Sequence, residues 1–164
     1  MKVTAPPRRF EIYSGGQTGV DRGALDCALE LGVDCGGWCP PGRLAEDGRI
    51  PDRYPLVELA EDECEGDGYT ARTRGNVEHS DGTLILCVSP PSGGTALTLQ
   101  VCRELHKPVI IINGRLISAQ EAGAHAEAFV AHMGIRRLNV AGPRASEWPE
   151  GHAYAQEVIR HVCH

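Results

Sequence analysis

The residues whose types and spacing point most directly to chemistry form a glycine-rich stretch between a β-prone run at 10–13 and a helical pattern at 20–31. Such glycines allow a sharp turn and a close approach of the backbone to a ligand. The N–H groups that open the helix face the turn, and the helix dipole favours an anion there. The stretch consists of Ser14, Gly15, Gly16, Gln17, Thr18, Gly19, Val20 and Asp21. It predicts a phosphate or other oxyanion site, and the alternative is a tight turn that binds nothing.

Two further glycine-containing turns follow apolar runs that are typical of buried strands, at 83–88 and 137–140. The second turn is a shorter version of the first, and Thr95 would donate to an oxyanion there. A helix start that is merely capped by Ser92 is the alternative. The candidate binding residues of the two turns are Ser92, Gly93, Gly94, Thr95, Gly142, Arg144 and Ser146.

Arginines are the candidates for balancing the charge of a bound anion, because the guanidinium fork matches a phosphate or carboxylate with two hydrogen bonds. Arg72, Arg74 and Asn76 lie close together on a predicted helix at 69–79. Arg144 is the strongest candidate, since it lies within the third turn. For the other arginines, a solvated position at the surface is the alternative.

Asp21 falls in the first turn of the predicted helix at 20–31. A carboxylate there compensates the helix dipole, or it holds a ribose, a metal or an amino group of a ligand. Glu46 and Asp47 could form a general acid/base pair, and a solvated acidic loop is the alternative. No Walker lysine follows either of the first two glycine turns, which argues against nucleotide hydrolysis by the P-loop route. We assign no catalytic residue and no metal ligand from the sequence.

Predicted strands alternate with predicted helices along the whole chain, which indicates a doubly wound α/β fold with a mainly parallel sheet between helices. The strands are expected at 10–13, 33–38, 83–88, 109–112 and 137–140. The helices are expected at 20–31, 69–79, 96–106, 119–133 and 154–163. All strand-to-helix loops of a parallel sheet lie at one edge, where ligands bind. The three glycine turns should therefore converge there.

Length and composition set the class of protein. The chain has 164 residues, a net charge of −6 and only 5% aromatic residues, so we expect no binding to nucleic acid. No run reaches the roughly 18 apolar residues of a membrane span. Residues 1–9 are polar, contain two prolines and lack the apolar centre of a signal peptide. We expect a flexible leader at 1–9, a single ligand-binding domain at 10–164 and a cytoplasmic location.

Several stretches, in order along the chain, carry a resemblance to a known family. They are residues 14–26, 37–40 with 42–43, 45–48, 50–51 with 54–56, 72–74 with 76–77, 80–83, 93–95 with 98, and 139–146. Together they closely resemble the molybdenum cofactor carrier family from residue 10 onward. The resemblance implies a Rossmann-like fold, usually assembled as a homo-oligomer (a dimer or tetramer). It implies a ligand that is molybdenum cofactor, a pterin with a dithiolene and a terminal phosphate, stored and transferred to molybdoenzymes.

The same superfamily contains phosphoribohydrolases, which carry the pattern P-G-G-x-G-T-x-x-E. At 92–100 this chain lacks both the second G-T and the glutamate of that pattern. Binding without turnover therefore fits the residues better than hydrolysis by that route. A nucleotide-processing enzyme with Asp21, Glu46 or Asp47 as the acid/base, or a nucleotide-sensing module, are the alternatives. The residues alone support only a phosphate-bearing small molecule as the ligand.

Overall fold

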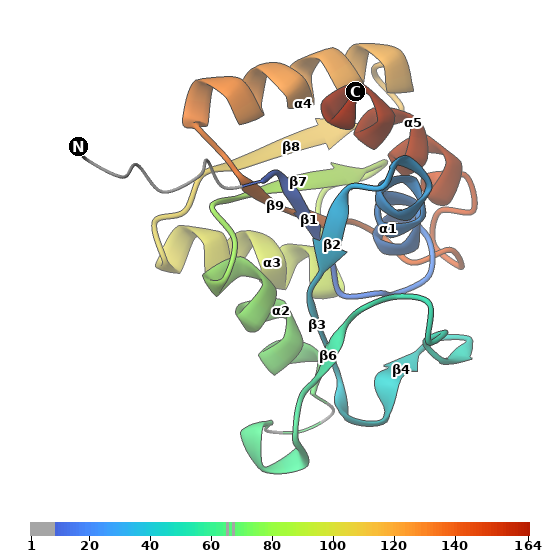
Figure 1. The fold of residues 1–164 in the computed structure, drawn as a ribbon, viewed down its shortest axis with the longest axis vertical. Coiled ribbons are helices and arrows are strands. Elements are labelled where there is room, and N and C mark those ends of the chain that lie inside the picture. Colours follow the sequence, from blue (N-terminus) through green and yellow to red (C-terminus); the bar gives the residue numbers. More distant parts are fainter. Residues whose placement is uncertain (1–8, 65, 67) are drawn as a thin grey trace, which may run out of the picture.

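The chain forms a five-stranded sheet that lies between two layers of helices (Figure 1). This computed structural model describes residues 9–64, 66 and 68–164. In pairing order the strands are β2 (Asp34–Gly36), β1 (Glu11–Tyr13), β9 (Arg137–Ala141), β7 (Gly82–Cys87) and β8 (Val109–Asn113). All four pairings between these strands are parallel. The predicted three-layer, doubly wound α/β fold is therefore confirmed.

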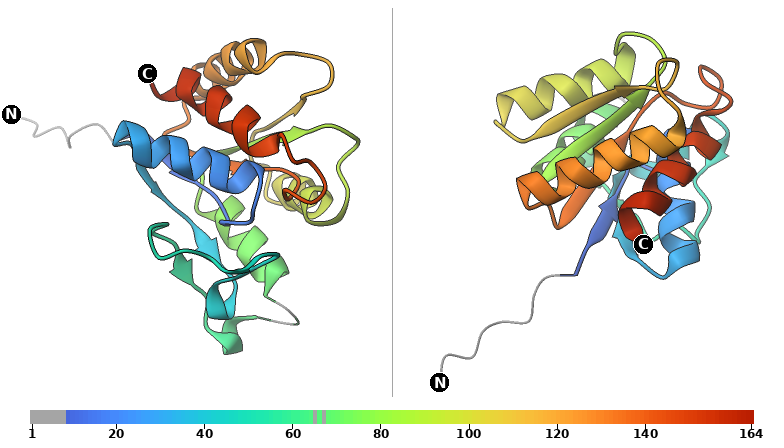
Figure 2. Two further views of the ribbon diagram at one scale, coloured as in Figure 1. Left: turned by 90° about the vertical axis from the view of Figure 1, so that its right-hand side faces the viewer. Right: turned by 90° about the horizontal axis from the view of Figure 1, so that it is seen from above.

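The helices divide into two groups, one on each face of the sheet (Figures 1 and 2). On one face α1 (Val20–Leu31), α4 (Ala119–Met133) and α5 (Gly151–Cys163) pack together. On the other face α2 (Tyr69–Glu78) packs against α3 (Gly93–Glu104). Apolar side chains of the strands and of the first group form the main core, and a smaller cluster lies beneath α2 and α3. Burial on both faces explains why β7 is apolar along nearly its whole length.

Two boundaries differ from the predicted ones in ways that bear on the site. Helix α3 begins at Gly93 and not at residue 96, so the second glycine turn is itself the first turn of the helix. The strand expected at 33–38 is interrupted by Gly37, whose φ of +137° is outside the range of a β-strand. A Cβ on Gly37 would collide with the carbonyl oxygen of Ser14, so this glycine lets the chain pass close to the first turn. The chain then continues as β3 (Trp38–Cys39).

The segment 38–59, which we call the lower lobe, lies beneath the sheet in Figure 1. The sequence predicted no strand or helix between residues 38 and 69. The structure instead contains the short 3₁₀ helices η1 (Pro41–Arg43) and, just after the lobe, η2 (Glu61–Glu63). It also pairs β3 with β6 (Val57–Glu58), and β4 (Leu44–Ala45) with β5 (Gly48–Arg49). The periodicity of such short elements is too brief to detect in the sequence.

A buried arginine holds the lower lobe together. The guanidinium of Arg43 donates to the backbone carbonyls of Ile50, Pro51, Tyr54 and Leu56 at 2.8 to 3.3 Å. These bonds satisfy carbonyl groups that no sheet ladder reaches. They also hold Arg43 at a φ of +53°, which is uncommon for a residue other than glycine.

The leader predicted for residues 1–9 lies outside the described residues, apart from Arg9. Within the described part of the chain, no helix combines the length and the hydropathy that a bilayer span requires. All seven cysteines belong to this part, and each of them is free.

Candidate functional site

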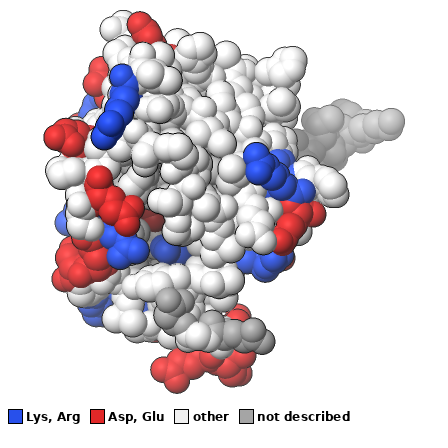
Figure 3. Space-filling view, turned by 180° about the vertical axis from the view of Figure 1, so that it is seen from behind, with Lys and Arg blue, Asp and Glu red and all other residues white. Residues whose placement is uncertain are grey.

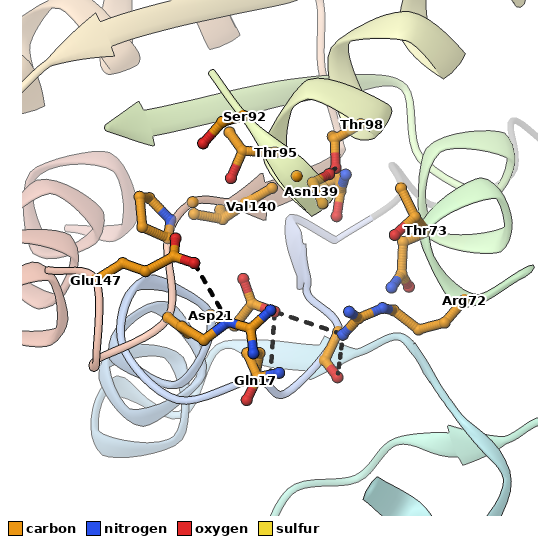
Figure 4. A pocket seen from close by; sticks show the side chains of 18 residues that line it. Gln17, Asp21, Arg72, Thr73, Ser92, Thr95, Thr98, Asn139, Val140 and Glu147 are labelled. Atoms are coloured by element: carbon orange, nitrogen blue, oxygen red, sulfur yellow. Dashed lines mark hydrogen bonds and ion pairs between the residues drawn. The ribbon is translucent and has the colours of Figure 1, made fainter. Parts of the chain in front are cut away.

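The three glycine turns meet at one hollow beyond the carboxyl ends of β1, β7 and β9 (Figure 4). The hollow contains about 660 Å³ of space, part of which is open to solvent. The predicted residues that line it are Gly15, Gln17, Asp21, Arg72, Asn76, Ser92, Gly93, Gly94, Thr95, Gly142 and Arg144. The predicted residues that do not line it are Ser14, Gly16, Thr18, Gly19, Arg74 and Ser146.

The N-terminus of α3 is the part of the hollow most open to a ligand. A Cβ atom added to Gly93 or Gly94 would meet no atom within 4 Å, so both glycines face empty space. Ser92 makes no side-chain capping bond to this helix, which rules out the capped-start alternative for its hydroxyl. The amides of Thr95 and Ala96 donate to the carbonyl of Ser92 at 3.1 and 3.2 Å, which leaves the amides of Gly93 and Gly94 without a partner among the described residues. This end of the hollow therefore offers donors to an anion.

Thr95 adds a second feature to the same end of the hollow. Its side chain is 8% exposed, and within the described residues its hydroxyl has no hydrogen-bond partner. Figure 4 shows Ser92 and Thr95 side by side at the edge of the hollow. Thr98 lies on the same face of α3, and its hydroxyl donates to the carbonyl of Gly94 at 2.9 Å. Among the described residues, the buried side-chain polar atoms without a hydrogen-bond partner are Ser14 Oγ and Arg72 Nε, so the Thr95 hydroxyl is open to solvent and can donate to a ligand.

Part of the first glycine turn is engaged within the protein, although Gly15 and Gln17 line the hollow. The amide of Gln17 donates to Asp21 Oδ2 at 3.2 Å, and the amide of Thr18 donates to Gln17 Oε1 at 3.0 Å. A Cβ on Gly16 would lie 2.5 Å from a methyl carbon of Leu56, and one on Gly19 would lie 2.7 Å from the carbonyl oxygen of Pro143. These glycines therefore permit packing within the protein.

Glu46 ties the first turn to the third one. Its carboxylate accepts hydrogen bonds from the hydroxyls of Thr18 at 2.9 Å and Ser146 at 3.2 Å. The neighbouring Asp47 accepts two hydrogen bonds from Arg22, which hold the pKa of its carboxyl below the usual range. Neither carboxylate lines the hollow. The structure therefore gives this acidic pair bridging contacts between the turns and the lower lobe.

Asp21 lines the hollow beside Arg72, on the side away from Ser92 and Thr95 (Figure 4). Burial raises the pKa of Asp21 to about 6, against the lowering effect of the Arg72 guanidinium. The two groups are 3.9 Å apart, and their side chains are only 10% and 12% exposed. Arg72 also donates to the carbonyl of Gly15 at 3.2 Å, while its buried Nε has no partner among the described residues. A carboxylate whose pKa lies near neutrality in a cleft is a marker of functional sites.

The other basic residues differ in their position. Arg144 lines the hollow, and its Nε lies 3.6 Å from Glu147 and 3.9 Å from Glu46. Arg74 lies outside the hollow and forms an exposed ion pair with Glu104. Arg72 and Arg74 are two residues apart on α2 and therefore lie on different faces of the helix, so only Arg72 lines the hollow.

Comparison with known proteins gives the family. A profile of the circularly permutated YpsA SLOG family matches residues 12–163. This chain belongs to that family. A solved structure of a "putative molybdenum carrier protein" from Syntrophus aciditrophicus SB is 39% identical in sequence, with a TM-score of 0.87, and the match covers 95% of this chain and 96% of the other. No curated protein matches the chain significantly. The resemblance drawn from the sequence motifs is thus confirmed.

The hollow of this SLOG chain contains residues that the sequence reasoning did not select as binding residues. They are Thr73, Thr98, Asn139, Val140, Ala141, Pro143 and Glu147. Two of them could have been selected from the sequence. Thr98 follows Gly94 by one helical turn, so both share a face. Asn139 is a polar residue within an otherwise buried strand, where an amide is expected only with a partner.

Proposed function

We propose that this protein binds a phosphate-bearing ligand of the molybdopterin type and holds it for storage and transfer to molybdoenzymes. The observation that carries the proposal is the N-terminus of α3, where among the described residues no atom lies within 4 Å of a Cβ added to Gly93 or Gly94 and the hydroxyl of Thr95 has no partner. Amides and a hydroxyl at a helix N-terminus suit a terminal phosphate. The name of the 39% identical carrier protein supports the choice of ligand.

The residues of the hollow fit the phosphate of such a cofactor. Arg72 and Arg144 supply positive charge in a chain whose net charge is −6. On the face seen in Figure 3, charged side chains of both signs lie along the left side and in a smaller group at the right, acidic ones lie at the lower end, and the upper middle is uncharged. Attraction of an anion therefore depends on the groups of the hollow and not on a broad basic surface. When bound, molybdenum cofactor supplies the dithiolene sulfurs that hold its own metal.

One observation favours the second candidate, an enzyme acting on a nucleotide. Asp21 has a pKa of about 6 and lines the hollow, so it could accept or donate a proton near neutral pH. Glu46 and Asp47 are weaker candidates for the acid/base, since both are engaged in bridging contacts outside the hollow. We rank this candidate second because the glutamate of the phosphoribohydrolase pattern is replaced by Gln100.

The test is a retention assay. Purified protein is mixed with isolated molybdenum cofactor, passed through a gel-filtration column, and assayed for pterin by fluorescence and for molybdenum by mass spectrometry. We expect both to elute with the wild type and with Arg74→Ala, and neither with Thr95→Val. Elution of the cofactor apart from the wild-type protein would refute the carrier proposal. A nucleotide product formed by the wild type and lost in Asp21→Asn would favour the enzyme instead. The same column would test the expected homo-oligomer.

A further inference from the structure

The hollow has two chemically different ends. At one end are the uncapped N-terminus of α3 and the hydroxyl of Thr95, which suit an anion. At the other end is the carboxylate of Asp21, which is 7% exposed. A carboxylate and a phosphate repel each other, so one anionic group cannot suit both ends equally well. The ligand should therefore present different chemistry to each end.

The Asp21 end is rich in hydrogen-bond acceptors. Asp21 Oδ2 accepts the amide of Gln17 at 3.2 Å, the hydroxyl of Ser14 also interacts with this carboxylate, and the guanidinium of Arg72 stands 3.9 Å away. Across from it in Figure 4 is Asn139, which is 3% exposed and uses its Nδ2 to donate to Thr83 at 3.3 Å. That bond leaves Asn139 Oδ1 as an acceptor. An ionised carboxylate has room for about four hydrogen bonds, so Asp21 has unused capacity.

From this arrangement we propose that Asp21 is a specificity-determining residue, which binds a hydrogen-bond donor that the phosphate-bearing ligand carries at a distance from its phosphate. The donor is a sugar hydroxyl or a ring N–H with its amino group, as in a pterin or a guanine. The inference rests on the proposed function, because it takes the phosphate to lie at the N-terminus of α3. It goes further by naming what the ligand presents at the opposite end.

The competing role for Asp21 is structural, as the acceptor that closes the first glycine turn. Asp21→Asn separates the two roles, because the asparagine Oδ1 can still accept the amide of Gln17. The substitution removes the charge and puts an NH₂ group in place of an acceptor oxygen. A purely structural role therefore predicts unchanged ligand preference in the variant.

The experiment is calorimetric titration of the full chain with four probes. Inorganic phosphate and methyl phosphate carry no donor beyond the phosphate, ribose 5-phosphate adds sugar hydroxyls, and guanosine 5′-monophosphate adds the aminopyrimidinone edge. In the wild type we expect donor-bearing probes to bind about tenfold or more tighter than methyl phosphate, as for a hydrogen bond to a charged group. If ribose 5-phosphate binds as tightly as the nucleotide, the donors that Asp21 recognises are the sugar hydroxyls. If the nucleotide binds more tightly, the donors are those of the ring edge.

In Asp21→Asn we expect this preference to vanish, while methyl phosphate and inorganic phosphate bind as well as before or tighter. Asp34→Asn, an exposed aspartate on β2, is the matched control and should keep the wild-type preference. An equal loss for all four probes in Asp21→Asn, or an unchanged preference, would overturn the inference but not the phosphate site. The wild-type comparison of methyl phosphate with the donor-bearing probes stands even if the variant does not fold. If no probe binds the wild type, the proposed function fails as well.

Discussion

Replacing Asp21 by asparagine should stabilise the protein at neutral pH, because the buried carboxylate is ionised there at a cost. An ordinary aspartate titrates at 3.8, whereas burial raises the pKa of Asp21 to about 6. The folded protein then binds the Asp21 proton more tightly than the unfolded chain does. The contribution of Asp21 to the free energy of unfolding is therefore largest below pH 3.8 and decreases as the pH rises through 6.

The size of the effect follows from the two pKa values. At pH 7.5 the loss amounts to about 3 kcal/mol, and at pH 5 to about 1.6 kcal/mol. Asparagine resembles the protonated acid and escapes this loss, while it keeps the contact with the amide of Gln17. For a domain of this length, 3 kcal/mol corresponds to a rise in Tm of roughly 6 to 12 °C.

Urea unfolding of the wild type and of Asp21→Asn at pH 5 and pH 7.5 measures the gain in the free energy of unfolding at each pH. The stability gain of the variant should increase by about 1.4 kcal/mol between the two pH values. Asp34→Asn should show no such increase, because Asp34 is exposed. A variant that is less stable than the wild type at pH 7.5, or a gain that does not depend on pH, would refute the burial argument.

Three further predictions follow from the same contacts. Gly94→Val should leave the melting temperature nearly unchanged, since its Cβ meets no protein atom, but should weaken phosphate binding in calorimetry about tenfold or more. Arg43→Ala should cost roughly 3 kcal/mol or more and speed hydrogen exchange within residues 38–59, because four hydrogen bonds from a charged donor are lost. Arg74→Ala should change urea-unfolding stability by less than about 1 kcal/mol and leave phosphate affinity unchanged, as its partner Glu104 is equally exposed.

The elements of the fold could be predicted because local periodicity and end signals specify them. Helices α1 and α4 occupy the predicted residues, and the apolar runs became β7, β8 and β9 with ends shifted by one residue at most. The meeting of the three glycine turns followed from parallel topology alone. The lower lobe could not be foreseen, because its order comes from Arg43 reaching carbonyls 7 to 13 residues away.

Which glycine turn is open could not be predicted from the turns themselves. The space next to Gly16 is filled by Leu56 and Ile50, which are distant in sequence. The amides of the first turn are occupied by Asp21 and Gln17, side chains that the sequence offered as ligand contacts. The second turn is open because it begins a helix without a side-chain cap, and this depends on the rotamer of Ser92.

The most direct test of the site is an amide NMR titration of the ¹⁵N-labelled protein with inorganic phosphate. If the anion lies at the N-terminus of α3, the amides of Gly93, Gly94 and Thr95 should shift in a saturable way, and those of Gly16 and Gly19 should move little. Thr95→Val should weaken the response. Shifts that are largest at Gly16 and Gly19, or no saturable shift at Gly93 and Gly94, would contradict the account.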